Sequence, residues 1–182
     1  MPRLFVPGFP DIPEDKKIDT IKFIEACEKI PSIFDLLGGK IFSPVKNDVI
    51  GNIEKIKKRY LENPVKFATL DDIIEVERHE TDKKLKAKDG NGLATNALMW
   101  LKRGLKFILL FLEHLLKNDY DSNPENLKSC AKLAYKALAL REGLNEEETL
   151  ESARVFSINF RATVDTVYEL FDKTGVEKFH KV

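Results

Sequence analysis

Three polar residues with complementary hydrogen-bonding groups recur at helical spacing in the second quarter of the chain. Asp48, Asn52 and Lys55 follow an i, i+4, i+7 pattern, which places them on one face of a helix. The carboxylate accepts hydrogen bonds, the amide donates and accepts, and the ammonium donates. Such a set suits the vicinal hydroxyls of a sugar. The alternative, on these residues alone, is the solvated face of an ordinary amphipathic helix.

The only tryptophan of the chain, Trp100, lies three residues before Arg103. At that spacing, the indole and the guanidinium occupy adjoining positions on one helix face. Trp100 is either a flat apolar platform at the mouth of an apolar pocket, on which a pyranose ring can stack, or the edge of a packed core beside a snorkelling charge. These two residues leave both interpretations open.

Other residues with catalytic or metal-binding chemistry match no recognisable site. His79, His114 and His180 have no metal-ligand spacing. An acidic loop begins like a calcium loop, but Pro124 takes its glycine position and Cys130 takes the place of its final glutamate. The sequence has no glycine-rich phosphate loop and no nucleophile-elbow serine. We therefore expect no enzymatic activity, no metal and no cofactor.

The composition favours a cytosolic globular protein. Lys plus Arg and Asp plus Glu number 30 each, so the formal net charge is zero and bulk nucleic acid is not the expected partner. A length of 182 residues is enough for one domain with a substantial core. Cys27 and Cys130 form no ligand motif and are expected to be reduced thiols. We expect no signal peptide and no membrane anchor.

Hydrophobic periodicity predicts an all-α fold in one domain over residues 1–182. Residues 1–13 contain four prolines and are expected to form an irregular arm. Thr69 is an expected helix N-cap, and the turn over residues 89–92 is the strongest break. The predicted helical segments are about 18–30, 33–37, 44–60, 70–86, 97–116, 124–140 and 146–173.

The predicted helix over residues 97–116 is apolar nearly all round, as a core helix or a membrane helix would be. Five polar side chains interrupt it, so no apolar run of 18 residues remains to span a bilayer; they are Lys102, Arg103, Lys106, Glu113 and His114. We predict a buried helix of a soluble protein. Its polar insertions need an explanation.

Two long motifs resemble the glycolipid transfer protein family. Residues 42–57 (FSPVKNDVIGNIEKIK) are similar to the family's sugar-recognition helix, and residues 97–108 (ALMWLKRGLKFI) are similar to its tryptophan-bearing helix. Shorter agreements occur at 30–38, 63–70 and the final Lys181-Val182. The similarity covers nearly all of residues 15–136 and about 145–182, in the family's order and spacing.

The resemblance implies a two-layer helical sandwich that holds one glycosphingolipid. In the family, the residues matching Asp48, Asn52 and Lys55 hydrogen-bond the sugar headgroup, and the residue matching Trp100 stacks on it. The ceramide chains enter an apolar tunnel, whose matching contributors are Phe34, Phe42, Val45, Phe107 and Phe111. Relatives that select ceramide-1-phosphate carry basic residues in place of Asn52 and Trp100, as a phosphate requires. This chain has the glycolipid-type residues.

The chain departs from the family pattern between Leu138 and Asn145, where about 30 residues are missing. By the resemblance, the loss removes a histidine at the ceramide amide, a tryptophan that docks on membranes and a helix that walls the tunnel, so the C-terminal half is shortened. Asn96 replaces an apolar residue one turn before Trp100. His180 takes the place of a tyrosine near the headgroup and is either a headgroup residue or a frayed terminal histidine.

The expected function is to carry a glycosphingolipid between membranes, without chemistry and with only transient binding to the membrane surface. Exposing roughly 30 methylenes to water at about 0.8 kcal/mol each would cost about 24 kcal/mol, so unassisted desorption is very slow. The alternative is a lipid sensor or adaptor that binds lipid or protein partners but does not shuttle lipid. Residues Ile33-Phe34-Asp35 weakly resemble the motif with which the family can bind VAMP-associated proteins; a core-packing turn is the preferred interpretation.

Overall fold

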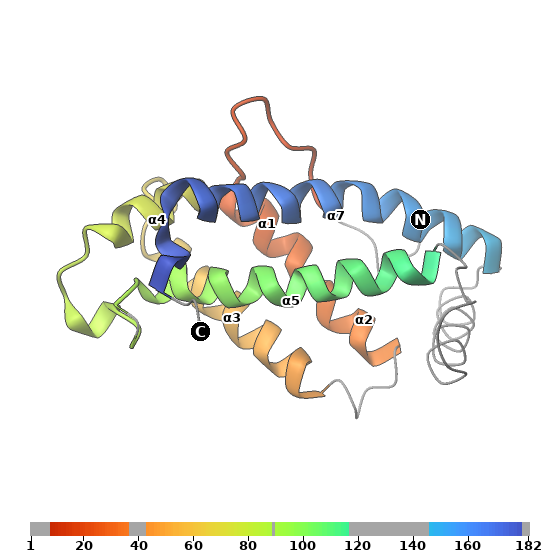
Figure 1. The fold of residues 1–182 in the computed structure, drawn as a ribbon, viewed down its shortest axis with the longest axis horizontal. Coiled ribbons are helices and arrows are strands. Elements are labelled where there is room, and N and C mark those ends of the chain that lie inside the picture. The colour runs from red at the N-terminus through yellow and green to blue at the C-terminus, as the bar shows by residue number, and fades with distance from the viewer. Residues whose placement is uncertain (1–7, 37–42, 89, 117–145, 180–182) are drawn as a thin grey trace.

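Helices make up almost all of the regular structure in the computed structural model, which describes residues 8–36, 43–88, 90–116 and 146–179 (Figure 1). Over those ranges, β pairing is limited to two isolated bridges, so the all-α prediction is confirmed. The α-helices are α1 (Thr20–Cys27), α2 (Ile30–Leu36), α3 (Ser43–Glu62), α4 (Leu70–Arg78), α5 (Leu93–Leu116) and α7 (Glu146–Thr174), and the 3-10 helices are η2 (Lys83–Leu85) and η3 (Val176–Phe179).

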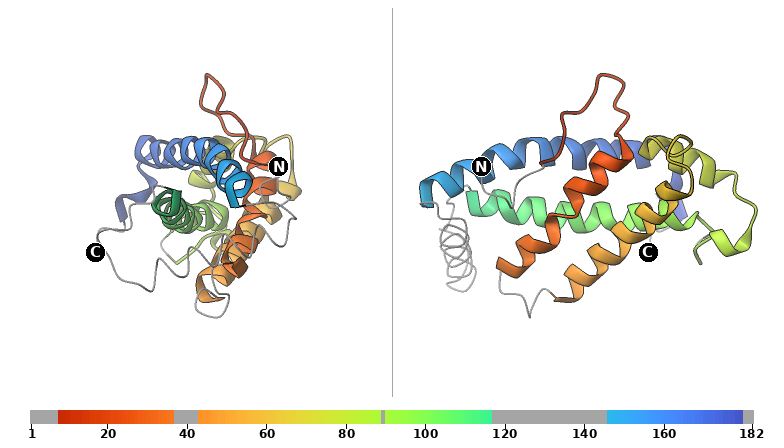
Figure 2. Two further views of the ribbon diagram at one scale, coloured as in Figure 1. Left: turned by 90° about the vertical axis from the view of Figure 1, so that its right-hand side faces the viewer. Right: turned by 180° about the vertical axis from the view of Figure 1, so that it is seen from behind.

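The helices form two layers (Figure 2). One layer contains α5 and α7 side by side, and the other contains α1, α2 and α3. α5 packs against α3 across the layers, against α7 within its own layer, and against α4 at one end. The leucine and isoleucine residues that recur at helical spacing along α5 are all buried, namely Leu98, Leu101, Leu105, Ile108 and Leu112. α5 therefore contacts helices of both layers, whereas α1 and α2 pack against α3.

The charged residues that interrupt α5 form ion pairs with the C-terminal part of the chain. Lys102 pairs with Glu177 of η3, and Lys106 pairs with Asp165 of α7. Glu113 pairs with Arg161, also of α7. These ion pairs join α5 to α7 and to η3, which explains why an otherwise apolar helix carries charged side chains.

No helix in the described part of the chain has an apolar stretch that could span a membrane.

The segment before α1 packs against α7 although it has no regular structure. Phe9 is buried, and its ring stacks on that of Phe160 with the centroids 4.7 Å apart. The Nδ2 atom of Asn159 donates hydrogen bonds to the Phe9 carbonyl oxygen at 3.2 Å and to Asp11 Oδ1 at 2.9 Å. An irregular segment near the start of the sequence thus contributes an aromatic side chain to the core.

The prediction of a helix over about 70–86 is wrong in its second half: α4 ends at Arg78. Its start agrees with the prediction, since Thr69 is the N-cap and forms a capping box with Asp72. Beyond the helix, the Glu80 carboxylate accepts hydrogen bonds from the backbone N–H groups of residues 81 and 82. Such local side-chain bonds compete with continued helix formation.

α5 begins at Leu93, about one turn earlier than the predicted residue 97. The chain turns back before it, where the Ala87 N–H donates to the Asn91 carbonyl oxygen at 2.7 Å. Gly90 adopts a φ of +84° in this turn, a conformation that glycine accepts without steric cost. The segment predicted as a helix over 124–140 lies outside the described residues.

Candidate functional site

The three polar residues at i, i+4, i+7 spacing lie on α3, where Val49, Ile53 and Ile56 form the buried stripe. Asn52 is only 3% exposed, and its Nδ2 atom donates a hydrogen bond to Asp48 Oδ2 at 3.2 Å. Asp48 and Lys55 are exposed. A buried amide therefore orients the carboxylate of an exposed residue through one of its two oxygens.

Trp100 lies on α5 with 45% of its surface exposed. The Arg103 guanidinium carbon is 4.8 Å from the centroid of the indole, a cation–π contact. The predicted adjacency of these two side chains is thus observed. A large exposed indole beside a fixed charge can offer a flat apolar surface to a ligand.

A glycine brings the two groups of candidate residues to neighbouring helix turns. Gly104 is one turn after Trp100, and a Cβ atom on it would lie 3.2 Å from Val49 Cγ2 on α3. Val49 directly follows Asp48, so α5 packs closely against α3 next to the candidate site. A larger side chain at residue 104 would push the two helices apart.

Glu177 of η3 connects the C-terminal end of the described chain to this part of α5. Its carboxylate accepts hydrogen bonds from Lys102 Nζ at 2.6 Å and from Arg103 Nη2 at 2.9 Å. Burial would raise the pKa of Glu177, but the hydrogen bonds from Lys102 and Arg103 outweigh it and the pKa lies below its ordinary value. The sequence does not identify Glu177 as a site residue, although the adjacent Lys102 and Arg103 on a core helix indicate that an acidic side chain lies nearby.

Lys102 is 1% exposed, so its ammonium is removed from solvent. The Nζ atom lies 3.8 Å from the ring centroid of Tyr168 and 5.0 Å from that of Phe171, both on α7. Burial raises the pKa of Tyr168. One carboxylate and two aromatic faces therefore take the place of water around this buried cation.

The described members of the predicted ceramide tunnel divide between core and surface. Phe34 of α2 is fully buried, and Phe111 is partly buried against the core. Val45 and Phe107 are 37% and 48% exposed. Phe107 lies seven residues after Trp100, so the two share a helix face. Phe42 and the headgroup candidate His180 lie outside the described residues.

The stretch that weakly resembles a protein-docking motif is part of α2. Ile33 and Phe34 are buried, and Asp35 pairs with Lys46 at 2.6 Å. This environment supports the interpretation of the stretch as a core-packing element.

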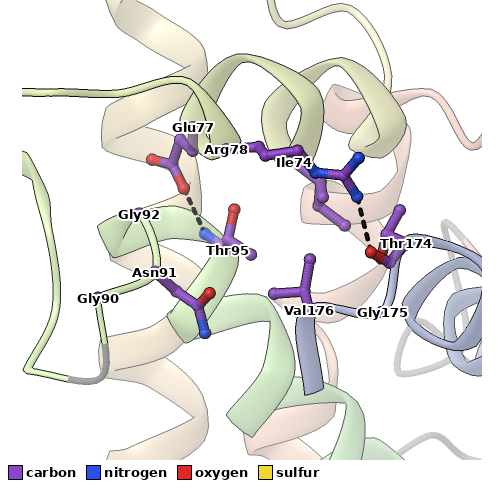
Figure 3. A pocket seen from close by; sticks show the side chains of 10 residues that line it. All are labelled: Ile74, Glu77, Arg78, Gly90, Asn91, Gly92, Thr95, Thr174, Gly175 and Val176. Atoms are coloured by element: carbon purple, nitrogen blue, oxygen red, sulfur yellow. Dashed lines mark hydrogen bonds between the residues drawn. The ribbon is translucent and has the colours of Figure 1, made fainter. Parts of the chain in front are cut away.

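A cavity of about 190 Å³ lies at the N-terminal end of α5, between α4 and the start of η3 (Figure 3). Glu77 of α4 forms part of its wall and accepts hydrogen bonds from the backbone N–H groups of Ala94 at 3.2 Å and Thr95 at 2.6 Å. The Nε atom of Arg59 lies 3.3 Å from the same carboxylate. The volume is below the roughly 300–1,000 Å³ usual for ligand pockets. We therefore assign these groups to helix capping.

No grouping of three or more His, Cys, Asp or Glu side chains suited to a metal ion occurs in the part of the chain that the structure describes. His79 Nε2 lies 3.2 Å from Glu75 Oε1 on the exposed surface of α4. The Cys27 thiol is fully buried, and burial, followed by the neighbouring Glu28, raises its pKa well above the ordinary value. It is therefore a protonated core side chain and not a thiolate ligand.

Comparison with known proteins finds a matching family model and similar proteins over nearly the whole chain. A family model described as Glycolipid transfer protein matches residues 18–141. The chain is 37% identical to a glycolipid transfer protein of Danio rerio over 205 residues, covering 96% of both chains. It is 35% identical to glycolipid transfer protein B of Xenopus laevis over 212 residues, covering 100% of both.

Solved structures have the same arrangement of helices. A fungal glycolipid transfer protein, HET-C2, superposes with a TM-score of 0.72 at 25% identity, covering 93% of this chain and 95% of that one. Mouse ceramide-1-phosphate transfer protein in its apo form superposes with a TM-score of 0.69 at 14% identity, covering 91% of each chain. The second likeness concerns the fold alone.

The comparison with the Danio rerio protein also bears on length. Its alignment has 205 positions, whereas 96% of the 182 residues of this chain take part. About thirty aligned positions therefore have no counterpart in this chain. This number agrees with the gap expected between residues 138 and 145, and the place of the gap remains a prediction.

Proposed function

This chain belongs to the glycolipid transfer protein family, and from that premise we propose that it binds one glycosphingolipid and transfers it between membranes without a chemical step. The observation that carries the proposal is the pairing of Asn52 with Asp48 on α3, next to the turn of α5 that bears Trp100. The names of the relatives from Danio rerio and Xenopus laevis support a glycolipid as the ligand.

In this proposal, the sugar headgroup binds over α3 and α5. Asp48 accepts hydrogen bonds from adjacent hydroxyls, because Asn52 leaves one of its carboxylate oxygens exposed. Lys55 donates from the same helix face, and within the described chain its ammonium forms no ion pair. The ring of the sugar stacks on the face of Trp100 that is away from Arg103. His180 would contribute one further hydrogen bond.

The ceramide chains require an apolar path that begins near the headgroup. We assign this role to Phe34, Phe42, Val45, Phe107 and Phe111. The exposed Val45 and Phe107 support an entry at the surface of α3 and α5, and the buried Phe34 supports an inner end between the layers. An apolar tunnel of this kind shields the lipid chains from water, whose contact costs about 0.8 kcal/mol per methylene.

We further propose that the chain forms one domain over residues 1–182, with a C-terminal half shortened between Leu138 and Asn145. The protein would act in the cytoplasm and bind membrane surfaces transiently. Residues 33–35 would bind a VAMP-associated protein only if Phe34 left the core, so core packing is their proposed role.

The alternative is a sensor or adaptor that binds glycolipid but does not release it into a second membrane. The shortened C-terminal half favours it, because a tunnel that lacks a wall would hold the lipid chains incompletely. Binding and movement of lipid separate the two functions.

Binding can be followed through Trp100, the only tryptophan. We expect its emission to change when vesicles containing galactosylceramide are added, and to stay constant with phosphatidylcholine vesicles. Asp48→Val should weaken sugar-dependent binding by at least about tenfold, equivalent to about 1.4 kcal/mol. Glu54→Val is a matched control, since it removes an equally exposed carboxylate from another face of α3. An unaltered emission, or full binding by Asp48→Val, would contradict the proposed site.

Transfer requires a separate measurement with donor vesicles that carry labelled galactosylceramide and unlabelled acceptor vesicles. We expect wild-type protein to accelerate movement of the label and Asp48→Val to lose the acceleration. Binding without movement would support the sensor or adaptor.

A further inference from the structure

Trp100 is linked through Arg103 to Glu177 of η3. Arg103 lies against the indole, with its guanidinium carbon 4.8 Å from the ring centroid. The same guanidinium donates through Nη2 to Glu177 Oε1 at 2.9 Å. Because the arginine side chain is 38% exposed, its long stem is free to adopt other rotamers unless its far end is fixed.

Glu177 is itself fixed from the other side. Its second oxygen accepts a hydrogen bond from Lys102 Nζ at 2.6 Å, and that ammonium is buried between α5 and the rings of Tyr168 and Phe171. Gly175, with a φ of +67°, ends α7 and reverses the chain into η3, which carries Glu177 back to α5. The carboxylate therefore lies between a buried cation, Lys102, and a partly exposed cation, Arg103.

At a partly exposed site, a cation–π contact and an ion pair each contribute up to about 1 kcal/mol, but the charge-assisted hydrogen bond is directional and therefore constrains the orientation of the guanidinium plane. The guanidinium that donates this hydrogen bond to Glu177 is the same group that lies against the indole. An indole with one face covered by a fixed guanidinium has only the opposite face available for a ligand.

We propose that Glu177 is a positioning residue for headgroup binding: through Arg103 it holds the indole of Trp100 in the orientation on which the sugar stacks. The inference rests on the proposed function, since it concerns the same site. The proposal gives η3 a role in ligand binding, because Glu177 of η3 contacts Arg103, which in turn contacts the indole.

The first test needs no lipid. We compare Glu177→Gln with Glu169→Gln, which removes an exposed partner of Lys16 from α7 and serves as a matched control. Acrylamide quenching and fluorescence anisotropy report on Trp100 alone. We expect about a twofold larger quenching constant and a lower anisotropy for Glu177→Gln, and wild-type values for Glu169→Gln. Equal values for both variants would overturn the proposal.

Arg103→Lys covers the case in which Glu177→Gln fails to fold. It retains a cation for Glu177 but loses the planar group that lies on the indole. We expect the same increase in Trp100 quenching together with a wild-type circular dichroism spectrum. Unchanged quenching in a folded Arg103→Lys protein would overturn the proposal.

The second test is a double-mutant cycle on vesicles that contain galactosylceramide, with binding measured by flotation. Glu177→Gln should weaken binding about threefold to tenfold in the wild-type background, within the range of coupling between neighbouring residues. In a Trp100→Phe background, the same substitution should cause no further loss. Equal losses in both backgrounds would mean that Glu177 acts only through general stability and would overturn the proposal.

The two proposals fail in different ways. If wild-type protein does not bind galactosylceramide vesicles, the proposed function fails, while the lipid-free quenching still decides whether Glu177 positions Trp100. If wild-type protein binds and transfers the lipid but quenching is the same in Glu177→Gln and Glu169→Gln, only the positioning role is overturned.

Discussion

At the scale of single residues, Lys102 shows how a core helix can carry a charge. Its ammonium is almost inaccessible to solvent, yet Glu177 and the faces of Tyr168 and Phe171 surround it. Removing one partner of a buried ion pair leaves an uncompensated charge, and the cost is larger when the charge that remains is the more deeply buried one, here Lys102. The two partners of this pair should therefore respond unequally to mutation.

We predict that Lys102→Met destabilises the protein less than Glu177→Gln at pH 7. Methionine fills the space beside the two rings, and Glu177 keeps its hydrogen bond with Arg103. Glu177→Gln instead leaves the buried ammonium without a carboxylate and should cost about 1.5–3 kcal/mol. Urea unfolding of both variants measures the difference. A larger loss in Lys102→Met would contradict this account of the pair.

The Glu177→Gln variant also tests the pH dependence. The pKa of Glu177 in the folded protein is lowered, so its contribution to stability is complete above the ordinary pKa of about 4.3 and is lost as the pH falls through the folded value. The difference in free energy of unfolding between wild type and Glu177→Gln should stay constant from about pH 8 to pH 6 and shrink below about pH 4. A difference that grows on acidification would contradict the lowered pKa.

At the scale of elements, the start of α5 depends on a side chain from α4. Glu77 accepts hydrogen bonds from two of the first backbone N–H groups of α5, which have no partner within the helix. Gly92 lies against that carboxylate, and a Cβ atom there would overlap the Glu77 side chain. The capping contact therefore requires a glycine immediately before the helix.

The requirement for glycine at residue 92 predicts that replacement by alanine has opposite effects on stability at Gly92 and at Gly51. Gly92→Ala should destabilise the protein by about 1–3 kcal/mol, because the new methyl group displaces Glu77 from the helix end. Gly51→Ala should stabilise it by about 0.5–1 kcal/mol, since residue 51 is within α3 and a Cβ atom there has no neighbour within 4 Å. Thermal unfolding of both variants checks the signs, and a loss of stability in both would count against the capping role.

At the scale of the whole molecule, the two ends of the described chain are joined through one aromatic cluster. Phe9 packs on Phe160 of α7 and also lies close to Phe23 of α1, with the ring centroids 6.5 Å apart. This contact links the two layers of the sandwich. Under the proposal of a single domain, a change at Phe9 should affect regions far from it.

We predict that Phe9→Ala lowers the free energy of unfolding by about 3–4 kcal/mol, as expected for deletion of a buried aromatic ring. Trp100 fluorescence and far-ultraviolet circular dichroism should report the same lowered midpoint in urea, because a single domain unfolds in one step. Val65→Ala is the control, since Val65 is almost fully exposed and should change stability by less than about 0.5 kcal/mol. Separate midpoints for the two probes would contradict a single cooperative unit.

The sequence by itself determined the helical class, the approximate ranges of α3 and α7, the apolar character of α5, and the N-cap at Thr69. It also placed Asp48, Asn52 and Lys55 on one face and Trp100 beside Arg103. These features depend on contacts three or four residues apart, and such contacts repeat along the chain in a period that the sequence displays. The motifs that indicated the family are also continuous segments of the sequence, so they too can be read without the tertiary structure.

Only the tertiary structure decided how those elements meet. The hydrogen bonds from Lys102 and Arg103 to Glu177 join residues 75 and 74 positions apart, and Asn159 reaches the Phe9 carbonyl across 150 positions. The cap of α5 was missed because Glu77 acts on a helix that begins sixteen residues later. No local period records such pairs, since their partners become neighbours only when the two layers pack. The surroundings of Trp100 are therefore a product of packing, although its position on the helix is not.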